Sequence, residues 1–256
     1  MNLGSSQELL ILCFFILGAC LGSFISTTAL RLSVKRSLLT PSCCDSCSEK
    51  VGMVGLIPLL GYAFKKGKCT YCRAKISPLY PAFELFNGLV FVWLFLHLGL
   101  SPELIQKGIL FELLMVFVLT DLIAMEVYIG PMILVLLVQS LWLWYFQPYL
   151  IQDALIGLLA GAGVLHWVST LFFYFRGREG LGLGDASLFG IMGFIFGWQK
   201  LLPILLIASL FGVLGGAFVL QFQKKSLQKE IAFGPWLIGA AILVWISPNW
   251  LTNLIP

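Results

Sequence analysis

Long apolar runs, separated by short polar or charged segments, dominate the sequence. A helix that spans a membrane needs about 20 mostly apolar residues, and eight runs approach this length. The predicted spans cover residues 7–30, 81–98, 103–122, 129–146, 151–175, 186–198, 201–222 and 232–250. We therefore expect an all-α polytopic membrane protein with about eight transmembrane helices. The sixth span is short, so we expect it to be tilted or to begin as irregular backbone.

The composition supports a membrane protein with little soluble structure. Hydrophobic residues make up 59% of the chain and charged residues 11%, whereas a typical soluble domain has about 25% charged residues. The net charge of +4 is too small to indicate nucleic-acid binding. We expect a first transmembrane helix over residues 1–30, a cysteine-rich loop over 31–80 and a seven-helix membrane core over 81–256.

Lysine and arginine are distributed unevenly between alternate loops. The loops after the first, fifth and seventh predicted spans hold 14 of the 16 Lys and Arg residues. Cytoplasmic loops of membrane proteins carry such an excess. The pattern predicts a multi-pass protein of the cell membrane, with both termini outside and the cysteine-rich loop in the cytoplasm.

Two aspartates lie where apolar runs begin or end. Gly180, Gly182 and Gly184 alternate along the chain and lead to Asp185, while Asp121 ends the apolar run 108–120. Charged residues at membrane depth are rare and often functional, and the predicted topology places both aspartates on the cytoplasmic side. Structural alternatives exist, because Asp185 could cap a helix N-terminus and Asp121 could extend from a helix end to water.

A pair of carboxylates can hydrolyse a peptide bond without a metal or a serine. One carboxylate is ionised and takes a proton from water, while the other is protonated and hydrogen-bonds to the scissile carbonyl. Two carboxyl groups held close together share a proton in this way. The sequence contains neither the G-x-S-x-G pattern of serine hydrolases nor the H-E-x-x-H pattern of zinc proteases.

Four cysteines form two C-x-x-C pairs in the 31–80 loop. Cys44 and Cys47 are separated by 21 residues from Cys69 and Cys72. This spacing favours a structural zinc site with four thiolate ligands. Cys43 could replace Cys44 as a ligand. Two disulfides or four free thiols are the alternatives, although disulfides are rare in the cytoplasm.

Together these motifs resemble those of the type IV prepilin leader peptidases, membrane aspartic proteases of the GxGD type that include the competence-pilin processing enzymes. The resemblance covers nearly the whole chain, and Asp121 and Asp185 are 64 residues apart, which also fits the family. The matching segments are Gly22-Ser23-Phe24 with Arg31, the four cysteines, Ile57-Pro58, Gly67-Lys68-Cys69, Tyr80-Pro81 with Glu84, Gly182-Leu183-Gly184-Asp185, and Phe233-Gly234-Pro235.

The resemblance implies a function and a set of site residues. Asp121 and Asp185 would be the catalytic pair, supported by Gly182, Gly184 and Glu84. The substrate would be a prepilin or pseudopilin with a short basic leader, cleaved at the cytoplasmic face. Family members often also methylate the new N-terminus with S-adenosylmethionine, an activity associated with the cysteine loop and with the position of Gly67. From its place near a helix start alone, Glu84 could simply be a favourable charge at a helix N-terminus.

Two segments depart from the family pattern. Residues 127–131 replace a Leu-Pro-Asp that commonly follows the first aspartate, and Gly52-Met53-Val54-Gly55 replaces an aromatic-rich stretch.

Two other classes of protein are alternatives to the peptidase. Intramembrane acids and broken helices also mark small transporters, and a zinc loop could dock a non-catalytic scaffold of the pilus machinery. Replacement of either aspartate should abolish the activity of a peptidase, could alter ion coupling in a transporter, and should hardly affect a scaffold.

Overall fold

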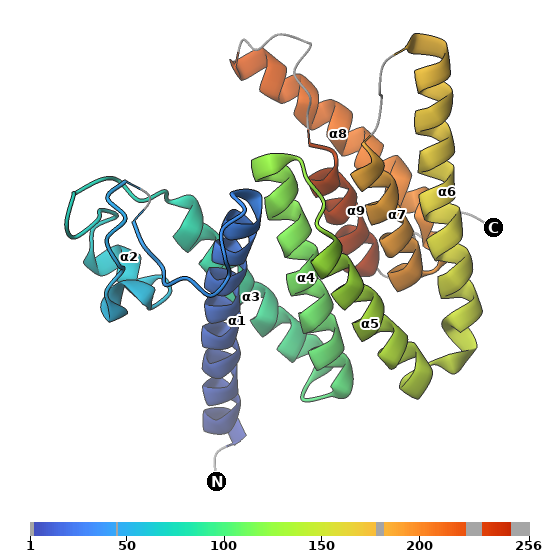
Figure 1. The fold of residues 1–256 in the computed structure, drawn as a ribbon. Helices are drawn as coiled ribbons and strands as arrows, with labels where there is room; N and C mark the ends of the chain where they lie inside the picture. The colour runs from blue at the N-terminus through green and yellow to red at the C-terminus, as the bar shows by residue number, and fades with distance from the viewer. Residues whose placement is uncertain (1–2, 45, 178–181, 224–231, 247–256) are drawn as a thin grey trace. The chain divides into compact units, whose positions relative to one another are not determined.

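The structure is a computed structural model that describes residues 3–44, 46–177, 182–223 and 232–246. Its main helices are α1 (Leu3–Ser33), α3 (Leu79–Leu98), α4 (Pro102–Ala124), α5 (Ile129–Phe146), α6 (Ile151–Arg176), α7 (Leu183–Phe196), α8 (Leu201–Gln223) and α9 (Gly234–Ile246) (Figure 1). The short elements are η1 (Met53–Leu56), α2 (Leu60–Phe64), η2 (Pro148–Leu150) and η3 (Trp198–Lys200). Within the described residues there is no strand, only two isolated β-bridges. The predicted all-α fold is confirmed.

Five of the described helices are long and apolar enough to cross a membrane: α1, α3, α5, α6 and α8. The chain is therefore a membrane protein. Helices α7 and α9 are apolar but shorter, and α4 carries four charged residues along its 23-residue length. Each of the eight predicted spans coincides with a helix, but the number of spans is not established by these helices alone.

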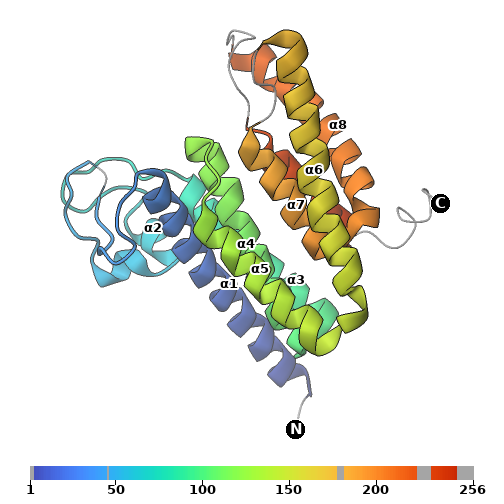
Figure 2. The same ribbon diagram turned by 45° about the vertical axis from the view of Figure 1, so that its right-hand side comes forward.

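The chain divides into two compact units, residues 1–116 and 117–256, and the boundary falls within α4. In the first unit α1 and α3 lie side by side (Figures 1 and 2). Phe14 of α1 stacks on Phe95 of α3, with ring centroids 4.6 Å apart. Leu94, Phe95 and Leu104 form a buried cluster at this end of the unit.

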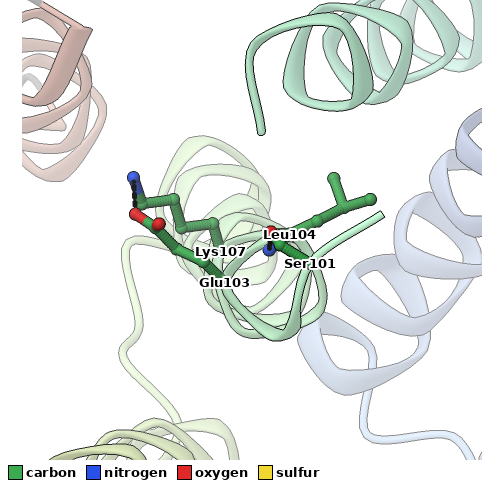
Figure 3. A network of polar contacts seen from close by, with 4 residues as sticks. All are labelled: Ser101, Glu103, Leu104 and Lys107. Atoms are coloured by element: carbon green, nitrogen blue, oxygen red, sulfur yellow. Dashed lines mark hydrogen bonds and ion pairs between the residues drawn. The ribbon is translucent and has the colours of Figure 1, made fainter. Parts of the chain in front are cut away.

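Helix α4 begins with a side-chain cap. Ser101 accepts a hydrogen bond from the backbone N–H of Leu104, 3.2 Å away (Figure 3). Serine at this position satisfies one of the free donors of a helix N-terminus. Glu103 in the first turn forms an ion pair with Lys107 in the next turn, at the helix surface. The cap and the ion pair explain why a helix with this many charges starts sharply at Pro102.

In the second unit α7 is the central helix, since it contacts α5, α6, α8 and α9. Leu188, Ile191 and Met192 are at most 1% exposed. A helix that is apolar on all sides is usually buried in this way. Helices α6 and α7 approach closely because Gly157 faces Gly193; a Cβ on Gly193 would lie 2.0 Å from the Gly157 carbonyl oxygen. Small residues allow such close helix packing in membranes.

Candidate active site and metal centre

Asp121 lies near the C-terminal end of α4 and is 6% exposed. Its Oδ2 accepts a hydrogen bond of 3.0 Å from the backbone N–H of Gly234, the first residue of α9. A Cβ on Gly234 would lie 2.6 Å from the same oxygen. The backbone approaches Asp121 this closely only because residue 234 has no side chain. Asp121 is therefore anchored on another helix, unlike a residue that extends freely to water.

Asp185 is the third residue of α7 and is partly buried. The N-cap of this helix is Gly182, whose extended backbone makes no side-chain capping bond. The Asp185 N–H donates to the Gly182 carbonyl at 3.1 Å. Asp185 is thus inside the first helical turn, and the alternative interpretation of it as an N-cap is wrong. The helix begins three residues earlier than the predicted span, because Leu183 and Gly184 are already helical.

The fold of the second unit brings Asp121 and Asp185 together. Their carboxyl groups lie close enough for a Coulombic interaction. Like charges at short range favour a state in which one group is ionised and the other is protonated. Such a pair can supply one base and one acid to the same reaction.

Gly184 makes a tight contact beside this pair. A Cβ on Gly184 would lie 2.7 Å from Cγ2 of Val127, in the segment between α4 and α5. Gly182, in contrast, is exposed, and among the described residues no atom would lie closer than 3.8 Å to an added Cβ. Gly184 therefore has a steric role, while Gly182 leaves an open, extended edge next to Asp185. Gly180 and Leu181 of the predicted motif lie outside the described residues.

The four predicted metal ligands gather at one point in the first unit. The Sγ atoms of Cys44, Cys47, Cys69 and Cys72 all lie within 4.8 Å of one another. Cys44 and Cys72 are 3.8 Å apart, and Cys47 and Cys69 are 3.9 Å apart. Tetrahedral zinc with bonds of about 2.3 Å requires sulfurs about 3.8 Å apart. The donor set and its spacing therefore fit zinc, and all four positions are filled by protein ligands.

Hydrogen bonds prepare one of these thiols for metal binding. Backbone hydrogen bonds from Cys72 and Tyr71 lower the pKa of Cys69 to about 6. At Cys47 a backbone hydrogen bond from Glu49 favours the thiolate, but desolvation and the other three thiols outweigh it and raise the pKa to about 12. All seven cysteines are free thiols, so the structure does not contain the alternative pair of disulfides. Cys43 is not part of the cluster.

Glu84 lies in the first unit and holds the cysteine loop against α3. The side chain is buried, and Oε2 accepts a hydrogen bond of 2.7 Å from the N–H of Leu59. Leu59 has a φ of 60°, a conformation that a non-glycine residue adopts only when its surroundings impose it. Because α3 begins at Leu79, Glu84 lies beyond the first turn. Its position therefore does not support a simple helix N-terminal charge.

Gly67 is constrained by its backbone and by a neighbour. Its φ is +65°, and a Cβ would lie 2.7 Å from the hydroxyl oxygen of Tyr62. Gly67 and Tyr62 line an open cavity of about 400 Å³ together with three lysines, Lys66, Lys68 and Lys75. Any side chain at residue 67 would disturb this cavity.

Two family models match the chain. Residues 16–98 match the bacterial peptidase A24 N-terminal domain, and residues 108–217 match the type IV leader peptidase family. The chain belongs to the type IV leader peptidase family. No solved structure is significantly similar to it.

Curated relatives in the family match most of the chain. The prepilin leader peptidase/N-methyltransferase of Bacillus subtilis is 30% identical over 91% of this chain and 92% of the relative. The protein of the same description from Stutzerimonas stutzeri is also 30% identical, over 97% and 93% of the two chains. That from Aeromonas salmonicida is 35% identical over 84% of this chain and 73% of the relative.

The two family matches separate the two groups of site residues. The N-terminal match contains the cysteine cluster, Gly67 and Glu84, and the second match contains both aspartates. Gly234, the hydrogen-bond partner of Asp121, lies beyond both. Sequence reasoning noted the Phe233-Gly234-Pro235 turn but gave it no chemical role, and it assigned none to Val127 or Leu59. A glycine before an apolar run was the only available signal for Gly234.

Proposed function

We propose that this member of the type IV leader peptidase family is a membrane aspartic endopeptidase that removes the leader from type IV prepilins or pseudopilins. Asp121 and Asp185 are its catalytic pair. The observation that carries the proposal is the juxtaposition of the two carboxyl groups, one of which is anchored on the N-terminal N–H of α9. The family assignment supports the substrate class, because the relatives are described as prepilin leader peptidases.

The surroundings of the two aspartates give them different roles. Asp121 accepts the Gly234 N–H of a distant helix, a bond that stabilises a carboxylate charge and fixes its orientation. Asp185 also lies in the first turn of a helix, so we assign Asp121 as the ionised base on its bond to Gly234 alone. Asp185 then carries the shared proton, since its neighbour is already charged.

Hydrolysis follows from this division. Asp121 takes a proton from water as the water oxygen bonds to the scissile carbonyl carbon, and the Asp185 proton passes to the carbonyl oxygen. The resulting gem-diol collapses when one hydroxyl proton returns to Asp185 and the proton on Asp121 passes to the departing amine. The carbon–nitrogen bond breaks, and the pair regains its starting protonation. The extended, exposed backbone at Gly182 offers an edge along which the substrate can lie beside Asp185.

The orientation of the protein in the membrane explains why cleavage would remove the leader of a prepilin. With the positive loops in the cytoplasm, both aspartates lie at the cytoplasmic ends of their helices and both termini lie outside. A prepilin's apolar helix would occupy the bilayer, and its short basic leader would remain on the cytoplasmic side. Cleavage therefore falls just before the apolar helix. We propose the same three parts of the chain as before: first span, cytoplasmic cysteine loop and membrane peptidase core.

The cysteine cluster would hold a structural zinc ion. Zinc bound to four thiolates would tie the two C-x-x-C turns together and stabilise a loop too small for its own core. With all four positions occupied by protein, Cys44, Cys47, Cys69 and Cys72 leave no place for a reacting water. The cysteine loop therefore has a structural role, and the two aspartates perform the hydrolysis.

The relatives' description as N-methyltransferases extends the proposal to methylation of the new N-terminus, with S-adenosylmethionine as methyl donor. The cavity beside Gly67 does not suit this cofactor, because its described lining holds three lysines and no carboxylate, whereas the cofactor has a net positive charge: its sulfonium and ammonium groups outnumber its one carboxylate. We assign no residue to the methyl donor.

Cleavage of a prepilin by the purified protein tests the peptidase function. The intact mass of the substrate would be followed with wild type, Asp121→Asn, Asp185→Asn and the control Glu126→Gln. Glu126 is exposed, lies five residues after Asp121 and hydrogen-bonds to Tyr128. We expect both asparagine variants to lose about 10²- to 10⁴-fold in rate or more and the control to cleave normally. Cleavage by both asparagine variants would exclude this pair as the catalytic residues, whereas no cleavage by wild type would favour a transporter or a scaffold.

A further inference from the structure

The two C-x-x-C turns of the cysteine loop are built alike. In the first, the Cys44 N–H donates to the carbonyl of residue 49, and in the second the Cys69 N–H donates to that of residue 74, both at 2.9 Å. Ser48 and Arg73 occupy the same place and have φ values of 59° and 60°. An isolated β-bridge closes each turn, Cys43 with Lys50 and Lys68 with Lys75. The first turn therefore serves as an internal reference for the second.

The two turns differ in the charges on their bridges. The first pairs a neutral cysteine with a lysine, whereas the second pairs two lysines. Like charges directly opposite each other across an antiparallel pair are destabilising. The first turn forms without such a pair, so the lysine pair of the second turn is not needed to build that turn. Because the repulsion between the two lysines destabilises the turn, their presence indicates a role other than folding.

The lysine pair opens onto the cavity beside Gly67. Lys66 joins Lys68 and Lys75 in lining its volume of about 400 Å³, and the other lining residues include Tyr62 and Ser77 but no acid. All three lysines are exposed. Within the described residues, none of them takes part in an ion pair. Three lysines that line one hollow, with no acid among the described lining residues, favour an anion there.

The cavity also lies where the chain enters a membrane helix. Ser77 and Pro78 line it and directly precede Leu79, the first residue of α3. Helix α3 is one of the helices that is long and apolar enough to span a membrane. Lysines next to a membrane helix attract anionic lipids, and the ammonium group of lysine binds phosphate as a point charge.

We propose that the cavity formed by Tyr62, Lys66, Gly67, Lys68, Lys75 and Ser77 binds the phosphate of an anionic lipid headgroup. The lipid fixes the cysteine loop against the membrane surface at the start of α3. The site is independent of the peptidase reaction, since it uses none of the residues assigned to catalysis. It gives the lysine pair a function and accounts for its absence from the first turn.

Lipid binding to the full-length protein tests this site. The purified protein in neutral detergent would be titrated with phosphatidylglycerol or phosphatidylcholine, and bound lipids would be counted by native mass spectrometry. Each lysine near an anionic surface contributes about fivefold to affinity. We therefore expect the double variant Lys68→Gln/Lys75→Gln to bind phosphatidylglycerol about 25-fold more weakly than wild type. Phosphatidylcholine should bind weakly to both proteins.

The matched control is Lys50→Gln, which removes the lysine at the equivalent bridge of the first turn. It should bind phosphatidylglycerol as wild type does. Equal weakening by both variants, or none by the double variant, would overturn the proposal. Unfolding temperatures measured without lipid should not fall in either variant, and the double variant, which removes the like-charge pair, should be at least as stable as wild type; this excludes loss of the fold as the cause. Inorganic phosphate should displace the lipid only at far higher concentration; displacement at equal concentration would assign the site to free phosphate and overturn the lipid assignment.

Discussion

The backbone N–H of Gly234 donates a hydrogen bond of 3.0 Å to Oδ2 of Asp121, although the two residues are 113 positions apart. This bond joins the end of α4 to the start of α9. It gives Asp121 a fixed orientation and a donor that favours its charged state. In the proposed mechanism the same bond distinguishes the base from the acid.

Gly234→Ala should therefore impair catalysis more than binding. The new methyl group would lie 2.6 Å from Oδ2 of Asp121, so the carboxylate must move. A displacement of about 1 Å can cost about 100-fold in rate, and we expect kcat to fall by that order with little change in KM. Gly239→Ala is the control on the same helix, because no atom of the described residues lies within 4 Å of its added Cβ. Steady-state cleavage of a prepilin measures both; a change in KM alone would contradict the role given to Gly234.

The contact between Gly184 and Val127 predicts a compensating pair. Gly184→Ala would place a methyl group 2.7 Å from Cγ2 of Val127 and push the start of α7, and with it Asp185, away from its neighbour. We expect cleavage to fall at least about tenfold, since tight sites lose rate when reacting groups are displaced. Val127→Ala removes the clashing methyl group. The double variant should then recover much of the lost rate, and a rate no better than that of Gly184→Ala would show that space is not the reason for glycine.

The apolar pattern was sufficient to predict the helices but not their ends. Every predicted span coincides with a helix, because a run of apolar residues in a membrane leaves the backbone no other way to satisfy its hydrogen bonds. The start of α7 was misjudged by three residues, since Leu183 and Gly184 look like loop in sequence. Because the helix starts earlier than predicted, Asp185 lies within its first turn and does not cap it.

The site was predictable where its residues are close in sequence and not where they are distant. The two C-x-x-C pairs encode their own geometry, because each pair already fixes two ligands in one turn. The partners of Asp121 and Glu84 could not be deduced. They are backbone groups of Gly234 and Leu59, and a backbone N–H has no signature in a sequence.

The proposed zinc site predicts a defined response to cysteine replacement. Cys69→Ser should lose most of the bound metal and leave the 31–80 loop open to proteolysis, because serine is a poor zinc ligand and the loop has little core of its own. Cys43→Ser should keep its metal, since Cys43 lies outside the cluster of four sulfurs. Metal content by elemental analysis, with limited proteolysis, measures both effects. Equal metal in the two variants would contradict the assigned ligand set.

The same site should lose its metal in acid. Metal requires thiolates, and protons compete for them as the pH falls. Because the pKa of Cys69 is lowered to about 6, this ligand is ionised at neutral pH and its contribution is lost as the pH falls through that value. Cys47, with a pKa raised to about 12, must release a proton when metal binds at pH 7. Calorimetry in buffers of different ionisation enthalpy counts the protons released on binding, and Cys47→Ser should release one fewer than wild type; an equal count would indicate that Cys47 is not a ligand.

Glu112, in the part of α4 within the first unit, predicts a gain in stability on replacement. The side chain is 6% exposed, and among the described residues neither carboxylate oxygen has a hydrogen-bond partner. A buried polar group without a partner costs about 1–3 kcal/mol, so Glu112→Leu should raise the free energy of unfolding by about that amount. Glu103→Gln, which removes only a surface ion pair with Lys107, should change stability by less than about 1 kcal/mol. Thermal unfolding in detergent would compare the two variants, and prepilin cleavage would be measured in parallel. A Glu112→Leu protein that is less stable than wild type would show that the carboxyl group has a partner essential to the fold, whereas a stable protein that no longer cleaves would give Glu112 a part in the reaction.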